Sequence, residues 1–285
     1  RKIGDSIEAL QVQAKEGPIE LQADIYVDAS GDGDVAAWSG EEFSLGRESD
    51  GKFQPMTLIF SLAGVATDDC DILHTDKAPL VEKLREYVDR GDVPYPAGHI
   101  IVIPGYRPGT VKVNMTNVID LDGTKSADLT EAEVVCRKQL AGIVEFLRAE
   151  ARGFEDCYVA ASAGVVGVRS TRHIQGQYVL NERDISQGRV FEDWAVSRAK
   201  YVWGTHNLYG PIHGEGQQES RKSDYGNLPT DKLYTIPYRS LLAAQTDNLL
   251  LAGRCISGTF LAASNYRVMP ICMAMGQGAG TAAAL

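Results

Sequence analysis

The chain has 285 residues, of which 44% are apolar and 23% charged, and its formal net charge is -10. This composition supports a globular core, and the negative charge argues against a surface for nucleic acid or an anionic membrane. No apolar run reaches the roughly 18–20 residues of a membrane span. The five cysteines form no C-x-x-C pair, which disfavours a thiolate zinc site and a dithiol redox motif and predicts a reduced, cytoplasmic protein.

The two ends of the chain are unusual. It opens on Arg1 directly before strand-like sequence, and it stops at Leu285 inside a helical pattern without a glycine or asparagine cap. We therefore expect a fragment of a longer protein.

The first fifty residues predict strands that lead into one short helix. Residues 6–29 have strand-like apolar stretches with a turn at Gly17-Pro18, and the last of them runs into the acid–glycine turn Asp28-Ala-Ser-Gly-Asp-Gly-Asp34. A small-residue helix over 35–39 follows and ends at Gly40.

The middle of the chain has a mixed pattern. It predicts strands near 56–60, 100–103, 110–118 and 177–180, and helices over 79–90 and 190–203, with a loop at 204–230. A long helix is expected to open at the capping box Thr130-x-x-Glu133 and to end near Gly153.

The end of the chain repeats the arrangement of the beginning. The apolar strand 248–251 breaks into the turn Gly253-Arg254, and a glycine-rich helix begins at Met269. In an α/β sheet, phosphates and cofactors bind where parallel strands end at open backbone N–H groups. We expect an α/β fold in which 1–50 and 234–285 form one discontinuous domain, with 51–233 inserted as an α+β domain.

The acidic turn allows several interpretations. Its spacing superficially resembles an EF-hand calcium loop, but the twelfth position, which needs a bidentate Glu, is Ser39. Without calcium, it is either a tight strand-to-helix turn capped by aspartates or the same turn placed against a dinucleotide.

The glycine-rich segment 276–280 is not a nucleotide fingerprint, because it follows a helical stretch rather than a strand. Close packing of a helix on a sheet explains it better. The start of that helix is more informative: Pro270 suits a first turn, and the free amides there favour a partial negative charge.

Several cations and histidines are candidates for chemistry. Arg169, Arg172 and His173 are closely spaced and are suited either to an anion or oxyanion or to ion pairs with acids such as Glu182 and Asp184. The same two roles, binding an anion or pairing with an acid, are open to Arg239 and Arg267.

The glycine-rich loop contains His206 and His213. Each is either a proton shuttle or an ordinary surface histidine. The histidines do not share metal-ligand spacing, so we expect no metal site.

Taken together, these segments resemble the FAD-dependent oxidoreductases of the glutathione-reductase-like superfold. The matches run through nearly the whole chain in the family's order. They are the acid–glycine turn, the segments 43–51, Gln54-Pro-Met-Thr57, Arg169-Ser-Thr-Arg172, Ile236–Leu241 and Asn248–Ser257, the run Arg267–Pro270, and 276–280.

The resemblance implies a Rossmann-like FAD-binding domain and an inserted substrate domain over the isoalloxazine. It implies hydride transfer between a small-molecule substrate and the flavin. It places Gly31, Asp32, Gly33, Asp34, Gly253, Arg254, Arg267, Met269 and Pro270 at the cofactor. It makes Arg169, Arg172, His173, His206 and Tyr238 the candidate catalytic residues.

One part of the family pattern is not in this sequence, namely the strand, G-x-G-x-x-G turn and helix that hold the pyrophosphate. We therefore expect an incomplete FAD-binding domain that is inactive alone. The alternative is a non-catalytic binding or structural module that retains the fold. The oligomeric state is not readable from the sequence.

Overall fold

The computed structural model describes residues 1–74, 77–211 and 228–285, and it is mixed α/β, as predicted. Its described residues form two compact units. The first comprises 1–52, 169–205 and 228–285, and the second comprises 53–168 and 206–211. The division into an outer domain and an inserted domain at residues 50 and 234 stays a prediction. In the structure, residues 169–205 pack with the two ends of the chain.

The first unit contains short strands, four α-helices and two 3-10 helices. They are β1 (Lys2–Ile3), β2 (Ser6–Ile7), β3 (Leu10–Ala14), β4 (Gly17–Leu21), β5 (Tyr26–Asp28), α1 (Asp34–Ser39), β6 (Phe43–Leu45), β11 (Arg172–Ile174), α5 (Glu182–Gln187), β12 (Trp194–Ala199), β13 (Tyr234–Pro237), η2 (Tyr238–Leu241), β14 (Leu249–Leu251), η3 (Gly253–Cys255), α7 (Phe260–Tyr266) and α8 (Met269–Ala284).

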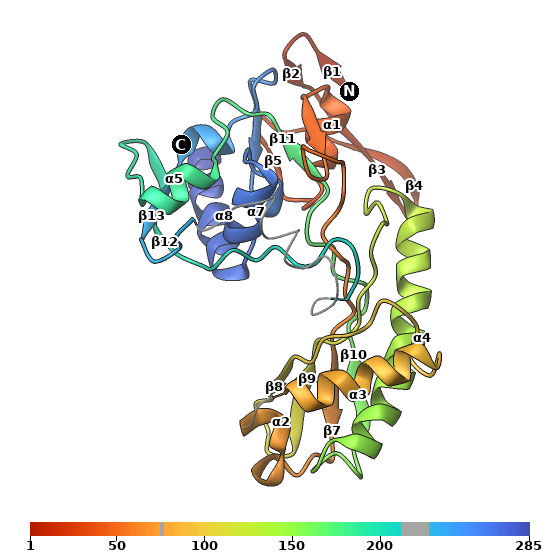
Figure 1. The fold of residues 1–285 in the computed structure, drawn as a ribbon. Helices are drawn as coiled ribbons and strands as arrows, with labels where there is room; N and C mark the ends of the chain where they lie inside the picture. The colour runs from red at the N-terminus through yellow and green to blue at the C-terminus, as the bar shows by residue number, and fades with distance from the viewer. Residues whose placement is uncertain (75–76, 212–227) are drawn as a thin grey trace. The chain divides into compact units, whose positions relative to one another are not determined.

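The two apolar strands at opposite ends of the chain pair with each other. β5 and β14 are parallel, with Leu249 opposite Tyr26 and Leu251 opposite Asp28. The helix α8 lies beside both strands (Figure 1). The sequence prediction that the ends of the chain meet is therefore confirmed in the structure.

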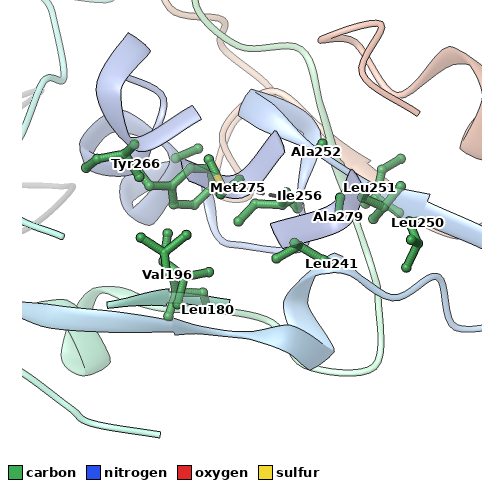
Figure 2. Close-up of a cluster of buried hydrophobic side chains, with 14 of the residues drawn as sticks. Leu180, Val196, Leu241, Leu250, Leu251, Ala252, Ile256, Tyr266, Met275 and Ala279 are labelled. Carbon is green, nitrogen blue, oxygen red and sulfur yellow. Dashed lines mark hydrogen bonds between the residues drawn. The ribbon is translucent and has the colours of Figure 1, made fainter. Parts of the chain in front are cut away.

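The core of the first unit lies between α8, β14 and the β12–β13 pair. Figure 2 shows Met275 and Ala279 of α8 in one apolar cluster with Leu251, Ile256 and Val196. Each large apolar side chain buried in this way stabilises the fold by about 1.5–3 kcal/mol. The cluster fixes the start of α8 against the turns that follow β5 and β14.

Two of the secondary-structure predictions for this unit were wrong. Residues 190–203 are not a helix, because Trp194–Ala199 form β12 and pair with β13, and Val196 buries against the core. Residues 177–180 form no strand: only Leu180 makes a bridge, to Gly258, and a capping box of Asn181 and Asp184 then starts α5. At 194–199 tertiary pairing outweighs the local pattern, whereas after Leu180 a local capping box begins a helix.

The second unit is an antiparallel sheet with helices. Its sheet has the order β10-β7-β9-β8, and α3 and α4 lie beside each other in the same unit (Figure 1). The elements are β7 (Phe60–Ala63), η1 (Thr67–Asp69), α2 (Asp71–His74), α3 (Ala78–Asp89), β8 (Val102–Pro104), β9 (Thr110–Val113), α4 (Ser126–Glu150) and β10 (Tyr158–Ser162).

The predicted capping box at Thr130 is also wrong, although the long helix exists. The helix α4 begins at Ser126, so Thr130 lies inside it and its hydroxyl donates to the carbonyl oxygen of Ser126. The Glu133 side chain pairs with Arg137 instead of turning back to a cap. A threonine that bonds to the carbonyl four residues earlier is compatible with helix interior.

Candidate functional site

Asp28 organises the turn that follows β5. Its carboxylate is buried, and one oxygen accepts hydrogen bonds from the Ser30 backbone N–H at 3.0 Å and the Ser30 hydroxyl at 2.7 Å. The other oxygen accepts from the Ala36 N–H at 2.9 Å, inside α1. Gly33, in the left-handed region at φ 64°, occupies the N-cap of that helix. The acidic turn is thus a strand-to-helix connection held by its first aspartate.

The second aspartate of the turn joins three segments that are far apart in sequence. Asp32 accepts a hydrogen bond from the Arg254 guanidinium at 2.7 Å and another from the Thr171 hydroxyl. Arg172 donates to the Asp32 carbonyl oxygen at 2.9 Å and to the Asp34 carboxylate at 2.7 Å. The side chains of Arg254 and Asp32 are only 20% and 17% exposed. The turn, η3 and β11 therefore form one partly buried charge network.

The glycine at position 31 allows this network to form. A Cβ atom on Gly31 would lie 2.8 Å from Nε of Arg254, so the guanidinium packs directly against the backbone of the turn. Its φ of 84° also lies in the region that favours glycine. Gly253, with φ 85°, makes the corresponding turn after β14. The close approach of the two turns therefore depends on Gly31, whereas Gly253 supplies the positive φ of the second turn.

His173 lies beneath this network and is closed off from solvent. It is 1% exposed, neither ring nitrogen has a hydrogen-bond partner among the described residues, and the ring meets Phe260 edge-on at 5.8 Å between centroids. Burial, and secondarily the positive charge of Arg254, lowers its pKa from 6.5 to about 4. Its cross-strand neighbour is Ser44, whose hydroxyl is likewise buried without a partner. The ring is therefore neutral near pH 7.

The start of α8 presents donors and a cation. Met269 and Pro270 are exposed, and no side chain caps the helix. Arg267, just before it, donates to the Gly204 carbonyl oxygen at 2.8 Å, while its buried Nε has no partner in the described part of the chain. Burial lowers the pKa of Arg267 to about 10, so it remains a cation at neutral pH. The helix dipole adds partial positive charge at the same end.

The other predicted site residues lie on other segments of the chain. Tyr238 belongs to η2, where its N–H donates to the Asp193 carbonyl oxygen at 2.6 Å. Arg169 is largely buried in the segment before β11. His206 belongs to the second unit, and its N–H donates to Gln54 at 3.1 Å. His213 lies outside the described residues.

Two contributors were not singled out from the sequence. Thr171 is 1% exposed, and its hydroxyl donates to Asp32. In the sequence, only its position between Arg169 and Arg172 marked it. Asp28 was grouped with the other acids of the turn, but it is the one that holds the turn together. Its position, immediately after the last apolar residue of the strand, was the available signal.

A scan against protein families matches residues 1–285 to the family described as FAD dependent oxidoreductase. The chain belongs to this FAD-dependent oxidoreductase family. Its cofactor is accordingly FAD, and the resemblance seen in the motifs is confirmed. No curated protein and no solved structure matches the chain in the corresponding comparisons.

The residues at the two strand ends fit FAD. The cofactor carries an anionic pyrophosphate and a flavin whose pyrimidine ring becomes negative on reduction. Arg254 and Arg267 supply cations, and Arg267 retains an unused Nε donor. Gly253 leaves the backbone of the turn after β14 open, and the uncapped start of α8 favours negative charge.

Within residues 1–74, 77–211 and 228–285, no group of three or more His, Cys, Asp or Glu side chains is placed to hold a metal ion. A search of the same residues found no helix with the length and apolar character to cross a membrane.

Proposed function

We propose that this protein transfers a hydride between a small-molecule substrate and its FAD. The family assignment gives the general flavin-dependent oxidoreductase activity. Hydride transfer with a small-molecule substrate is the more specific reaction that we add to it. When bound, FAD supplies the redox chemistry, accepting or donating two electrons at its isoalloxazine. The charge network that joins both strand ends carries the proposal on the structural side.

We further propose that the first unit is the Rossmann-like, FAD-binding part and the second an inserted substrate domain. The parallel pairing of β5 and β14, each followed by a glycine turn, supports the first assignment. The second rests on the resemblance and on the compactness of the second unit. On this view the inserted domain spans 53–168 and the chain around 206–211, rather than 51–233.

The contacts support distinct tasks for Arg172, Arg254 and Arg267. Arg172 is committed to Asp34 and to the Asp32 backbone, so we assign it to positioning the turn. Arg254 and Arg267 are proposed to bind the cofactor, with Asp32 orienting the Arg254 guanidinium. His173 is too buried to touch a ligand in this conformation. We retain His206, Arg169 and Tyr238 as candidates for substrate binding or proton transfer.

Cofactor titration tests the proposal. Arg254→Ala should weaken FAD binding at least about tenfold, since hydrogen bonds to charged groups contribute about 1.5–3 kcal/mol. Arg239→Ala is the matched control, because Arg239 is also ion-paired, with Asp193 at 2.8 Å, in the same unit. Flavin fluorescence measures binding, and bleaching of the flavin absorbance by candidate substrates measures reduction. Equal FAD affinity in the two variants would contradict the assignment of Arg254.

A further inference from the structure

A cavity in the second unit combines two aromatic residues with an acid and a base. It has a volume of about 470 Å³ and opens between α3, the segment Tyr95–Gly98 and the segment Tyr209–Pro211. This volume falls in the range of about 300–1,000 Å³ that is typical of small-molecule sites. Its polar lining side chains are Arg85, Asp89, Tyr95 and Tyr209, and its apolar ones include Val81 and Val88.

Buried amides hold the walls of this cavity from below. Asn117, with no exposed surface, donates to the carbonyl oxygens of Pro96 at 3.3 Å and Gly210 at 3.4 Å, and so ties the two loop walls together. Gln139 is equally buried and donates to the Pro94 carbonyl oxygen at 3.0 Å while exchanging hydrogen bonds with the Asn117 backbone. Interior hydrogen bonds therefore fix the walls, in addition to the surface bond that the Tyr95 hydroxyl donates to the Tyr209 carbonyl oxygen at 3.5 Å.

A third buried amide shapes the Tyr209 wall. Asn207, also without exposed surface, accepts from the Tyr209 N–H at 3.1 Å and donates to the Pro211 carbonyl oxygen at 2.6 Å. A Cβ on Gly98 would lie 2.5 Å from Cβ of Pro211, so the loop walls are in direct contact. The cavity is thus preorganised, which lowers the entropy cost of binding.

The charges of the lining favour a neutral ligand. Arg85 and Asp89 lie four residues apart on the same face of α3, so the cavity wall carries one positive and one negative side chain. The Arg85 guanidinium already pairs with Glu82 at 2.8 Å. An anionic ligand would meet the Asp89 carboxylate, and a cationic one would meet Arg85.

The polar content of the lining favours a ligand with many hydroxyl groups. The Asp89 carboxylate makes no ion pair or hydrogen bond with the described residues. A flat hydrocarbon would remove water from a carboxylate, a guanidinium and two phenols, and it would offer no hydrogen bonds in place of those that the water made. A sugar ring offers hydroxyls that both donate and accept, and C–H faces that pack on the rings of Tyr95 and Tyr209.

We propose that this cavity binds a neutral, hydroxyl-rich ring of the size of a mono- or disaccharide. Binding of such a ring does not depend on the flavin chemistry. A role of the bound ring as the hydride donor rests on the proposed function. The wall at Tyr209 begins three residues after His206 in the sequence, and a carbon that carries a hydroxyl group is a centre from which a hydride can be removed.

Saturation-transfer NMR on the full chain tests the proposal without any flavin readout. The probes are glucose, galactose, xylose and cellobiose, with glucuronate and benzyl alcohol as charged and flat comparators. We expect signal transfer to at least one neutral sugar, and weaker or no transfer to both comparators. No transfer to any neutral sugar, or stronger transfer to a comparator, would overturn the proposal.

Matched variants then locate the binding. Asp89→Ala and Tyr95→Ala should weaken sugar binding at least about tenfold, because each removes a group that replaces ligand–water hydrogen bonds or packs on the ring. Glu86→Ala on the exposed face of α3 and Tyr106→Ala, at a tyrosine that is 98% exposed, should leave it within twofold. Circular dichroism checks folding, and Tyr95→Phe offers a milder variant. Unchanged affinity in both cavity variants would refute the site, even if FAD is reduced normally by another compound.

Discussion

The Asp28 carboxylate provides a direct test of how the acidic turn is held. In Asp28→Asn, the new NH₂ group must face a backbone N–H whichever way the amide is turned, that of Ser30 or that of Ala36. The variant loses at least one charge-assisted hydrogen bond, worth about 1.5–3 kcal/mol, and leaves a buried donor without an acceptor. We expect the free energy of unfolding of the first unit to fall by about 2–3 kcal/mol.

The tryptophans make this measurement specific. The chain has three, Trp38, Trp194 and Trp203, and all lie in the first unit. Urea titration followed by tryptophan fluorescence therefore reports that unit. With a slope of about 1–3 kcal/mol per molar urea, the expected loss moves the midpoint by roughly 1 M.

The control for this prediction is Asp24→Asn. Asp24 is an exposed aspartate four residues earlier whose side chain makes no hydrogen bond with residues that the structure describes. The same change of charge there should alter the free energy of unfolding by no more than about 0.5 kcal/mol. If Asp28→Asn and Asp24→Asn shift the midpoint equally, the carboxylate does not hold the turn and the account of the site given above is wrong.

Three further predictions concern buried polar groups of the first unit. The folded chain keeps His173 neutral with a pKa of about 4, whereas the imidazole of the unfolded chain titrates near 6.5. The contribution of His173 to the free energy of unfolding is therefore fully present above pH 6.5 and falls by up to about 3 kcal/mol as the pH drops to 4. His173→Phe should remove this part of the acid-side slope in urea titrations, at little cost at pH 7.5; an unchanged slope would exclude the histidine as its source. Burial and the Asp28 charge raise the pKa of Cys255 to about 12, so a thiol reagent should modify at most the half-buried Cys272 before denaturation, and early labelling of Cys255 by mass spectrometry would contradict the packing. Tyr234→Phe removes a hydroxyl that donates to the Asn265 side chain at 2.7 Å, which should cost about 1–2 kcal/mol by the same fluorescence titration, whereas no loss would show that the bond contributes nothing.

The proposed role of Arg254 at the cofactor predicts that cofactor binding and the packing of β11 are linked. Asp32 bonds to Arg254 on one side and to Thr171 on the other. A change in the Arg254 guanidinium is therefore expected to reach β11 through a single carboxylate. This connects a predicted cofactor residue to the arginine segment whose role the sequence left open.

Local sequence determined the two strand ends and their turns. The apolar runs before Asp28 and Gly253, the glycines that tolerate positive φ, and Pro270 at the start of α8 each act within a few residues of chain. Such signals depend on backbone conformation and on burial pattern, so they can be read without knowing what packs nearby. The same motifs, in their order, were sufficient to indicate the family.

Tertiary structure decided what those local signals could not. Val190 to Trp203 has helix-compatible sequence, but pairing with β13 makes its centre a strand, because edge hydrogen bonds and the burial of Val196 outweigh a weak local preference. Whether Arg172 binds an anion or an aspartate depends on a partner 138 residues away, Asp34. Likewise, nothing around His173 in the sequence indicates that its ring is sealed beneath Phe260. The identity of a side chain's neighbours is a property of the folded chain, and the charge and accessibility that govern chemistry follow from those neighbours.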